Sequence, residues 1–392
     1  MKNTGVVARG IVTPIFRQGD DIIDIIYNSL IDAAKDGGFE LADGDIVGVT
    51  EAIVGRVQGN YATLDQISKD VRTKFGGGTL GIVFPILSRN RFSGILQGIA
   101  RGCDKLIIQL SYPQDEVGNK LVDLQTCDEN GVDPTCDNFT EKDFRKIFGM
   151  ETVHKFTGVD YIEYYKEIGG NCEIVFSNDP RYILNYSKNV LCCDIHTRRR
   201  TQKLIESAGA EKCLCLDDIL CEPVDGSGYS EYGLLGSNKA TSEAVKLFPI
   251  NTDKFVHELQ AELKKRTGAT LEVMVYGDGC FKDPMGGIWE LADPVVSPAF
   301  TSGLAGTPNE LKIKYIADND FADLSGQELT DNIRKRIKNK EGNLVGKMAS
   351  EGTTPRRIHD LVGSLCDLVS GSGDRGTPVV LVQNYFKNYA SE

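Results

Sequence analysis

Hydrophobic and polar positions change their period several times along the first hundred residues, which is typical of an α/β protein. The apolar residues between Ile22 and Ile31 fall on one broad helical face, and this helix is expected to end at Gly37-Gly38. The same pattern predicts buried strands at residues 10–14, 46–50, 80–84 and 105–110 and a helix at residues 88–102. The N-terminal part of the chain is therefore expected to alternate strands with helices.

The alternation is expected to stop after residue 110, and residues 111–228 form a less periodic region. This region holds a charged stretch, an aromatic-rich segment around Tyr161, Tyr164 and Tyr165, and most of the cysteines. Periodic helices and strands return at residues 251–265, 271–276, 353–371 and 379–382. We therefore expect an α/β core made of residues 1–110 and 229–392, with residues 111–228 as an insertion or second subdomain.

Composition narrows the class of protein. Hydrophobic residues make up 41% and charged residues 26% of the 392 positions, as in ordinary folded proteins. The formal net charge of −12 disfavours a large surface for nucleic acid or anionic membranes. The first residues lack the features of a signal peptide, and no run of about 18 apolar residues occurs. The expected location is the cytoplasm, and the eleven cysteines are expected to be reduced thiols.

Two glycine–aspartate turns are the first candidates for chemistry. Gly19-Asp20-Asp21 precedes the first helix, where free amides bind phosphate and a carboxylate reaches Mg²⁺; the alternative is an ordinary helix cap. Asp278 follows a buried strand directly, between Gly277 and Gly279. Ligands of open α/β sheets bind at this end of the strands, and oxygen ligands suit Mg²⁺ or Mn²⁺. The alternative for Asp278 is a simple turn.

Further charged side chains are weaker candidates. Glu290 and Asp293 lie beside the single tryptophan and are able to complete a metal site, although Asp-Pro is also a common turn. Arginines are candidate anion clamps, but most exposed arginines are only solvated. These arginines are Arg89, Arg91, Arg101, Arg356 and Arg357.

Several familiar catalytic motifs are absent from the sequence. No glycine-rich stretch fits the P-loop, no zinc-binding spacing of histidines and cysteines occurs, and no G-x-S-x-G elbow is found. These absences disfavour a P-loop nucleotide hydrolase, a zinc enzyme and the simplest serine hydrolases.

Taken together, these segments resemble the coenzyme F-420 gamma-glutamyl ligase family. The N-terminal likeness lies in the strand before Pro14, the Gly19-Asp20-Asp21 turn and residues 43–59. Later segments follow in the family's order: residues 233–238 resemble Gly-Ile-Asp-x-Ser-Asn, residues 247–249 resemble Leu-Leu-Pro, residues 276–278 resemble the strand-end metal aspartate, and the helix with Asp360 precedes the closing strand. Residues 111–228 are largely outside the likeness.

The resemblance implies a mixed-sheet α/β fold, an intertwined homodimer, and a GTP- and divalent-metal-dependent ligase that attaches L-glutamate through an amide. It implies that Asp278 binds metal. It also implies nucleotide contacts from six residues, which are Gly19, Asp20, Asp21, Thr50, Glu51 and Asn238. The acceptor is expected to be a deazaflavin coenzyme precursor or a folate-like pterin.

The sequence departs from the family at three places. Leu235 stands where the family has a metal-binding aspartate, and Ala52 stands where a basic residue is expected. Phe281-Lys282-Asp283-Pro284 replaces a Gly-Arg-Pro segment after Asp278. Glu290, Asp293 or Asp283 is expected to supply the missing carboxylate.

Amide ligation requires activation of a carboxylate, because a carboxylate is a poor electrophile. We expect the γ-phosphoryl group of GTP or ATP to form an acyl phosphate, which the amine of an amino acid then attacks. In this scheme Asp278 holds Mg²⁺ or Mn²⁺, and Arg56 or Lys282 holds a phosphate or carboxylate. Two alternatives remain open: a metal-dependent phosphoryl transferase that stops at the kinase-like step, and a non-catalytic protein that binds a nucleotide or cofactor.

Overall fold

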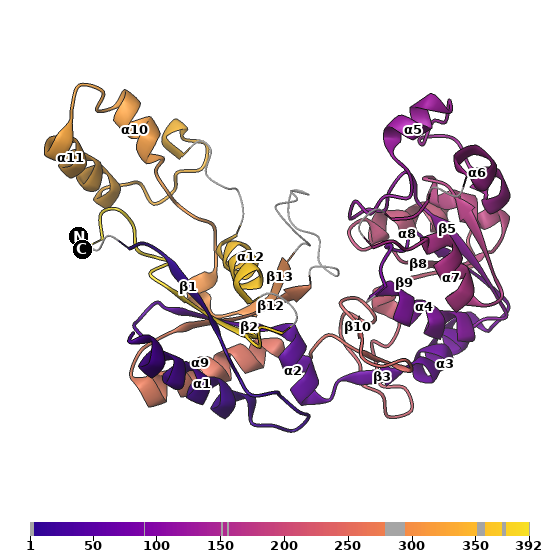
Figure 1. Cartoon of the computed structure of the whole chain (residues 1–392), viewed down its shortest axis with the longest axis horizontal. Coiled ribbons are helices and arrows are strands. Elements are labelled where there is room, and N and C mark those ends of the chain that lie inside the picture. Colours follow the sequence, from indigo (N-terminus) through magenta and orange to yellow (C-terminus); the bar gives the residue numbers. More distant parts are fainter. Residues whose placement is uncertain are drawn as a thin grey trace. The chain divides into compact units, whose positions relative to one another are not determined.

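The computed structural model describes residues 4–89, 91–149, 152–154, 157–278, 295–350, 357–370 and 374–391. Contacts divide the chain into two units. The first comprises Met1–Val54, Asn251–Gly277 and Val295–Glu392, and the second comprises Gly55–Ile250 and Asp278–Pro294. The sequence-based boundaries at residues 110 and 228 stay a prediction. Figure 1 labels the elements of both units, which are described one at a time below.

The first unit is built on a five-stranded mixed sheet of order β1-β14-β2-β12-β13. β1 (Val7–Ile11) is antiparallel to β14 (Val379–Gln383), and β14 is antiparallel to β2 (Ile46–Thr50). β2 is parallel to β12 (Glu272–Asp278), and β13 (Val295–Phe300) completes the sheet. The carboxyl ends of β1, β2 and β12 therefore lie at the same edge of the sheet.

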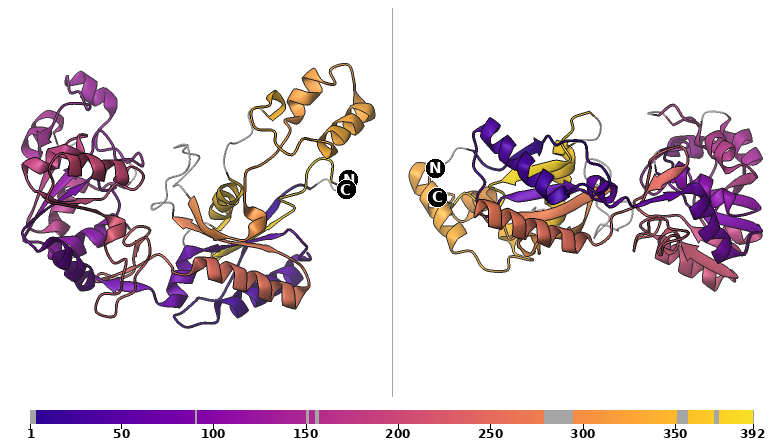
Figure 2. Two further views of the ribbon diagram at one scale, coloured as in Figure 1. Left: turned by 180° about the vertical axis from the view of Figure 1, so that it is seen from behind. Right: turned by 90° about the horizontal axis from the view of Figure 1, so that it is seen from below.

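Helices cover both faces of this sheet. α1 (Ile22–Gly37) and α9 (Thr252–Thr267) lie on one face and α12 (Ile358–Ser370) on the other, as Figures 1 and 2 show. α12 buries Val362 and Cys366 in one apolar cluster with residues of β2, β12 and β14. The α/β class expected from the sequence is confirmed.

Two further helices belong to the same unit. α10 (Ile313–Asn319) and α11 (Gly326–Lys338) bury Ile316, Ile333 and Ile337 in a small apolar cluster of their own. Because this cluster is separate from the one beneath α12, these helices form a satellite of the main core.

The second unit contains a six-stranded sheet of order β6-β7-β5-β4-β8-β9. β4 (Thr79–Val83), β5 (Lys105–Leu110), β7 (Cys172–Phe176), β8 (Asn189–Cys192) and β9 (Lys212–Cys215) run parallel. β6 (Phe139–Thr140) is antiparallel to β7. Three of these parallel strands lie within residues 111–228, so the expectation that the strand–helix alternation stops at residue 110 is wrong.

Helices connect and cover these strands. α3 (Leu64–Phe75) packs closely on α4 (Phe92–Arg101), because a Cβ at Gly98 would lie only 2.9 Å from the Ile67 side chain. The other helices of this unit are α5 (Leu124–Glu129), α6 (Glu141–Phe148), α7 (Tyr161–Gly169) and α8 (Arg198–Ser207). Tyr165 of α7 is fully buried, and its hydroxyl donates to the Ile86 carbonyl oxygen. Tyr165 therefore has a structural role in the core of this unit.

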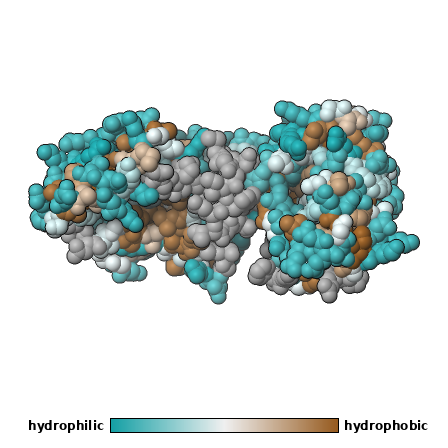
Figure 3. All heavy atoms as spheres, turned by 90° about the horizontal axis from the view of Figure 1, so that it is seen from above, coloured by the Kyte–Doolittle hydropathy of each residue, from teal (hydrophilic) through white to brown (hydrophobic). Residues whose placement is uncertain are grey.

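On the face that Figure 3 shows, most of the described residues are hydrophilic, and apolar residues lie among them. Within the described part of the chain, no helix combines the length and the apolar character needed to span a membrane. The ten described cysteines are free thiols.

Candidate active site

Three segments that the sequence analysis selected follow or end strands of the first sheet. The Gly19-Asp20-Asp21 turn follows β1, Thr50 and Glu51 end β2 and begin α2 (Glu51–Gln58), and Asp278 is the last residue of β12. β2 and β12 are neighbouring parallel strands in which Thr50 pairs with Tyr276. This is the edge at which open α/β sheets bind their ligands.

The Gly19-Asp20-Asp21 turn has a clear structural role. Gly19 adopts a φ of +84°, which favours glycine. The Asp20 carboxylate accepts a hydrogen bond from the Arg17 amide at 2.6 Å, and Asp21 caps α1 by accepting from the Asp24 amide at 3.0 Å. The helix-cap alternative is confirmed, and a contact of this turn with a nucleotide stays a prediction.

Glu51 brings a buried carboxylate to the junction of β2 and β12. Only 4% of its surface is exposed. A Cβ on Gly277 would lie 2.3 Å from the Glu51 Cγ, so glycine is required at this position of β12. Thr50 is fixed beside them, because its amide donates to the Pro378 carbonyl oxygen at 3.0 Å. The carboxyl ends of β2 and β12 therefore carry a buried acidic side chain.

Several predicted site residues lie outside the described part of the structure. They are Lys282, Glu290 and Asp293, together with the substituted segment 281–284. The last residue of β12, Asp278, is described only by its backbone. The roles of these four site residues stay predictions.

A second group of predicted residues lies in the second unit. Asn238 belongs to a small sheet of order β10-β11-β3, formed by β10 (Asn238–Lys239), β11 (Ala244–Lys246) and β3 (Tyr61–Thr63). Asn238 is directly opposite Lys246 in the antiparallel register. The Lys246 Cδ lies 3.7 Å from the position of a Cβ on Gly55, the residue before Arg56.

Lys246 was not selected from the sequence, although it is a lysine within an apolar run, Val245-Lys246-Leu247-Phe248. Its surface is only 9% exposed. A buried lysine in a strand is unusual. The sequence signal for it was a single lysine among apolar residues.

Leu235 occupies an apolar environment within the second unit. It is 2% exposed and lines a pocket with Ile86, Phe92, Leu216 and Leu234. A carboxylate in this position would lose its hydration among hydrocarbon side chains. The leucine therefore fits its surroundings.

A second concentration of acidic groups lies beyond the carboxyl ends of the parallel strands in the second unit. Glu116 accepts hydrogen bonds from the amides of Ile195 and His196, the latter at 3.0 Å. Burial raises the pKa of Glu116 to about 7. Asp194, which is 1% exposed, accepts from the hydroxyls of Thr197 and Thr201, both at 2.7 Å. The hydrogen bonds of Glu116 connect the loop after β5 to the loop after β8, and those of Asp194 connect the latter loop to the start of α8.

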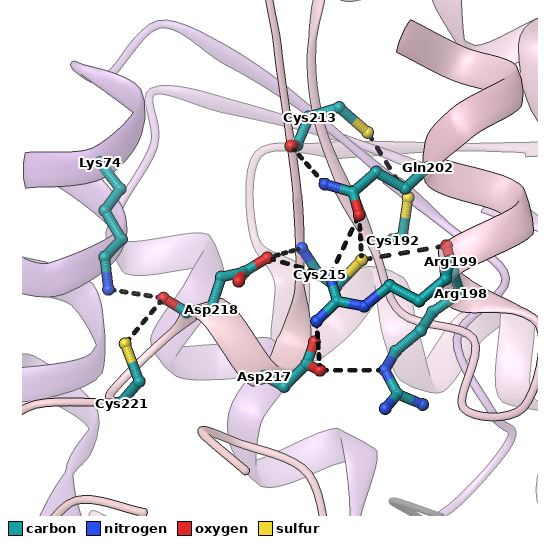
Figure 4. A network of polar contacts seen from close by, with 10 residues as sticks. All are labelled: Lys74, Cys192, Arg198, Arg199, Gln202, Cys213, Cys215, Asp217, Asp218 and Cys221. Carbon is teal, nitrogen blue, oxygen red and sulfur yellow. Dashed lines mark hydrogen bonds and ion pairs between the residues drawn. The ribbon is translucent and has the colours of Figure 1, made fainter. Parts of the chain in front are cut away.

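The end of β9 carries a polar network that brings three potential metal ligands together (Figure 4). The ligand atoms of Cys215, Asp217 and Asp218 lie within 4.8 Å of one another. However, Asp217 pairs with Arg198 at 3.2 Å and with Arg199 at 2.7 Å. Because guanidinium groups already supply the positive charge, the network fits a structural ion pair better than a metal site.

These features define an α/β protein with a polar, carboxylate-bearing edge on its first sheet. The family model described as F420-0:gamma-glutamyl ligase matches residues 10–384, and the chain belongs to this family. Membership confirms the resemblance found in the sequence and supports a ligase role connected with F420 biosynthesis, with a small-molecule acceptor and glutamate. A search of curated proteins gives no match.

Proposed function

We propose that the protein is a nucleotide- and divalent-metal-dependent amide ligase that adds L-glutamate, or another amino acid, to a carboxylate acceptor. The observation that carries this proposal is that Thr50-Glu51 and the end of β12 lie side by side at the carboxyl ends of two neighbouring parallel strands. Family membership supports the ligase class. The acceptor is a deazaflavin coenzyme precursor or a folate-like pterin.

The residues at this edge fit a divalent metal and a phosphate chain. Carboxylate oxygens are the ligands that Mg²⁺ and Mn²⁺ prefer, and the missing side chain of Gly277 leaves Glu51 close to the backbone of β12. Asp278 would hold the metal, with Glu290 and Asp293 as further candidate ligands. When bound, the metal would neutralise charge on the phosphate oxygens.

The chain's own residues bind and orient the reactants in this scheme. The Gly19-Asp20-Asp21 turn, Thr50, Glu51 and Asn238 position the GTP or ATP. The acceptor carboxylate oxygen attacks the γ-phosphorus, the nucleoside diphosphate leaves, and the amine then displaces inorganic phosphate from the acyl phosphate. Arg56 or Lys282 stabilises the negative charge on the phosphate or carboxylate oxygens during these two steps.

We assign the implied homodimer to the free edge of the first sheet. β1 is an edge strand, and between it and α1 lies an open groove of about 810 Å³. Val12 is 69% exposed and Ile15 is 82% exposed beside this edge. An uncovered strand edge with apolar side chains favours pairing with another strand.

A thermal-shift screen tests the nucleotide and metal requirement. The purified protein is heated with GTP, ATP, GDP or ADP, each with Mg²⁺, Mn²⁺ or EDTA. A ligand at 100 times its Kd stabilises a protein by about 2.7 kcal/mol. A metal-dependent shift that is lost in Asp278→Ala is the expected result, and no shift with any nucleotide would contradict the proposal.

Product analysis separates the ligase from the two alternatives. A ligase releases phosphate only when both acceptor and amino acid are present. Release of the nucleoside diphosphate without an amino acid, with the phosphoryl group retained on the acceptor, would indicate a kinase-like transferase. Tight nucleotide binding without turnover would indicate a non-catalytic binding protein.

A further inference from the structure

The five parallel strands of the second unit follow a doubly wound order. Along the sheet they lie as β7-β5-β4-β8-β9, so the chain moves outward from β4 to β5 and β7 and then returns to the other side of β4 for β8 and β9. The direction reverses between β4 and β8, which are hydrogen-bonded neighbours. Open α/β sheets bind their ligands at such a reversal, outside the carboxyl ends of the strands.

The chain leaves these two strands towards opposite faces of the sheet. α8, which follows β8, buries Ile205 in one apolar cluster with Val83 and Ile107. α4, which follows β4, packs on α7, and a Cβ on Gly169 of α7 would lie 3.8 Å from Ile108. Successive residues of a strand point to opposite faces, so Ile107 and Ile108 mark the two faces. The loops after β4 and β8 therefore diverge.

The pocket that Leu235 lines lies at this reversal, and we call it the β4–β8 crevice. Its walls come from the loops after β4 and β8, the residue after β9, the start of α4 and residues 234–237. The apolar wall residues include Ile86, Phe92, Ile95, Ile195, Leu216 and Leu234. Arg91 and Ser237 are the polar side chains among the described lining residues. The sheet topology and the position of the pocket thus select the same place.

Buried carboxylates hold the two loops that border the crevice. Asp115, which is 4% exposed, accepts a hydrogen bond from the Leu87 amide in the loop after β4 at 2.8 Å. Glu116 accepts from the amides of Ile195 and His196 in the loop after β8. The loop after β5 therefore connects both rims, and the crevice is formed without a ligand, as most small-molecule sites are.

The crevice is narrow. It encloses about 20 Å³, which is room for one water-sized group, within about 310 Å³ of empty space that is open to solvent. A charged group would lose its hydration between the apolar walls. A flat, uncharged group suits this space better than a bulky one, and Phe92 adds an aromatic ring to the wall.

We propose that the β4–β8 crevice binds a neutral, planar heteroaromatic ring. The ring is either the base of the nucleotide or the ring of a deazaflavin or pterin acceptor, and the inference rests on the proposed function only for this choice. β8 and β9 lie within residues 111–228, which are largely outside the family likeness. The likeness therefore does not assign this crevice.

Titration calorimetry of the full chain with phosphate-free ring compounds tests the proposal. The compounds are riboflavin, pterin, guanosine and adenosine, and the proteins are the wild type, Phe92→Leu and the matched control Phe144→Leu. Phe144 is also buried, but it stacks on Phe176 and is not among the lining residues of the crevice. We expect Phe92→Leu to weaken ring binding by about 3- to 10-fold, the loss of an aromatic contact, and Phe144→Leu to bind like the wild type.

Each outcome decides a part of the proposal. Tighter binding of riboflavin or pterin assigns the crevice to the acceptor, and tighter binding of guanosine or adenosine assigns it to the base. A wild type that binds none of the four compounds, equal losses in both variants, or equally tight binding of the non-planar cyclohexanol would overturn the proposal. If the Tm shows that Phe92→Leu does not fold, Ile95→Phe decides instead, because its larger side chain fills the enclosed space. Unchanged ring affinity in a folded Ile95→Phe overturns the proposal.

Asp278→Ala separates this inference from the proposed function. The variant is expected to keep its affinity for the ring compounds while it loses the metal-dependent shift with nucleotide. Ring binding by a wild type that forms no amide would contradict the proposed function and leave the crevice assigned. Amide formation by a wild type that binds no ring compound would overturn the crevice and leave the proposed function in place.

Discussion

At the residue scale, the contact between Gly277 and Glu51 determines where the Glu51 side chain lies at the edge of the first sheet. The strand reaches its neighbour closely because position 277 has no side chain, and the buried Glu51 carboxylate occupies the space that results. A methyl group at position 277 must displace Glu51 or the strand itself. The glycine is therefore part of the candidate site, although it carries no reactive group.

Gly277→Ala tests this contact. Overpacking of a closely packed position costs about 1 to 3 kcal/mol, so we expect the free energy of unfolding in urea to fall by that amount and the metal-dependent thermal shift to shrink. Gly342→Ala is the matched control, because no atom lies within 4 Å of a Cβ there. A Gly277→Ala protein with wild-type stability and ligand response would refute the expected role of the glycine.

Glu116 gives a pH-dependent prediction. Burial raises the pKa of this carboxyl from 4.5 to about 7 in the folded protein. Its stabilising contribution is therefore complete below pH 4.5 and is lost as the pH rises through about 7. We expect Glu116→Gln to reduce the fall in Tm between pH 5 and pH 8. The exposed Glu206→Gln serves as the control, and an unchanged pH profile in Glu116→Gln would count against this linkage.

At the element scale, the start of α1 performs a structural task and is predicted to perform a second one. Asp21 caps the helix, and removal of such a cap costs about 1 kcal/mol. Serine caps a helix nearly as well as aspartate but carries no charge. A pair of substitutions therefore separates capping from any contact with nucleotide or metal.

We expect Asp21→Ala to lower the free energy of unfolding by about 0.5 to 2 kcal/mol and Asp21→Ser to leave it nearly unchanged. If Asp21 also contributes to the nucleotide site, both variants should bind GTP or ATP with Mg²⁺ more weakly than the wild type. Chemical denaturation and titration calorimetry measure the two effects separately. Wild-type affinity in Asp21→Ser would limit this residue to capping.

Elements with long or regular apolar patterns could be predicted from the sequence. These include α1, β2, β12 and β14, and they place the edge that carries the candidate site. β7, β8 and β9 were missed because Glu173, Asn189 and Lys212, together with the cysteines, interrupt their apolar pattern. Lys246 was missed because its pairing with Asn238 depends on strand register, which the local pattern does not encode.

At the scale of the whole molecule, the two larger sheets of the described residues differ in design. The first is mixed and ends in the free strand β1, whereas the second is parallel except at the short strand β6. The first presents an edge strand, β1, bordered by a wide groove and by the exposed apolar residues Val12 and Ile15. Self-association is therefore expected to depend on the first unit.

Light scattering coupled to size-exclusion chromatography tests this expectation. The wild type should have twice the 42.9 kDa mass of one chain. Val12→Lys combined with Ile15→Lys should shift it towards one chain, since charges placed directly after an edge strand oppose its pairing with another strand. The exposed Val345→Lys, which lies away from β1 in the sequence, should leave the mass unchanged. Both substituted positions beside β1 are exposed, so a lower mass with an unchanged Tm would show that association is lost while the fold is kept. A monomeric wild type would contradict the assignment of the dimer to this edge.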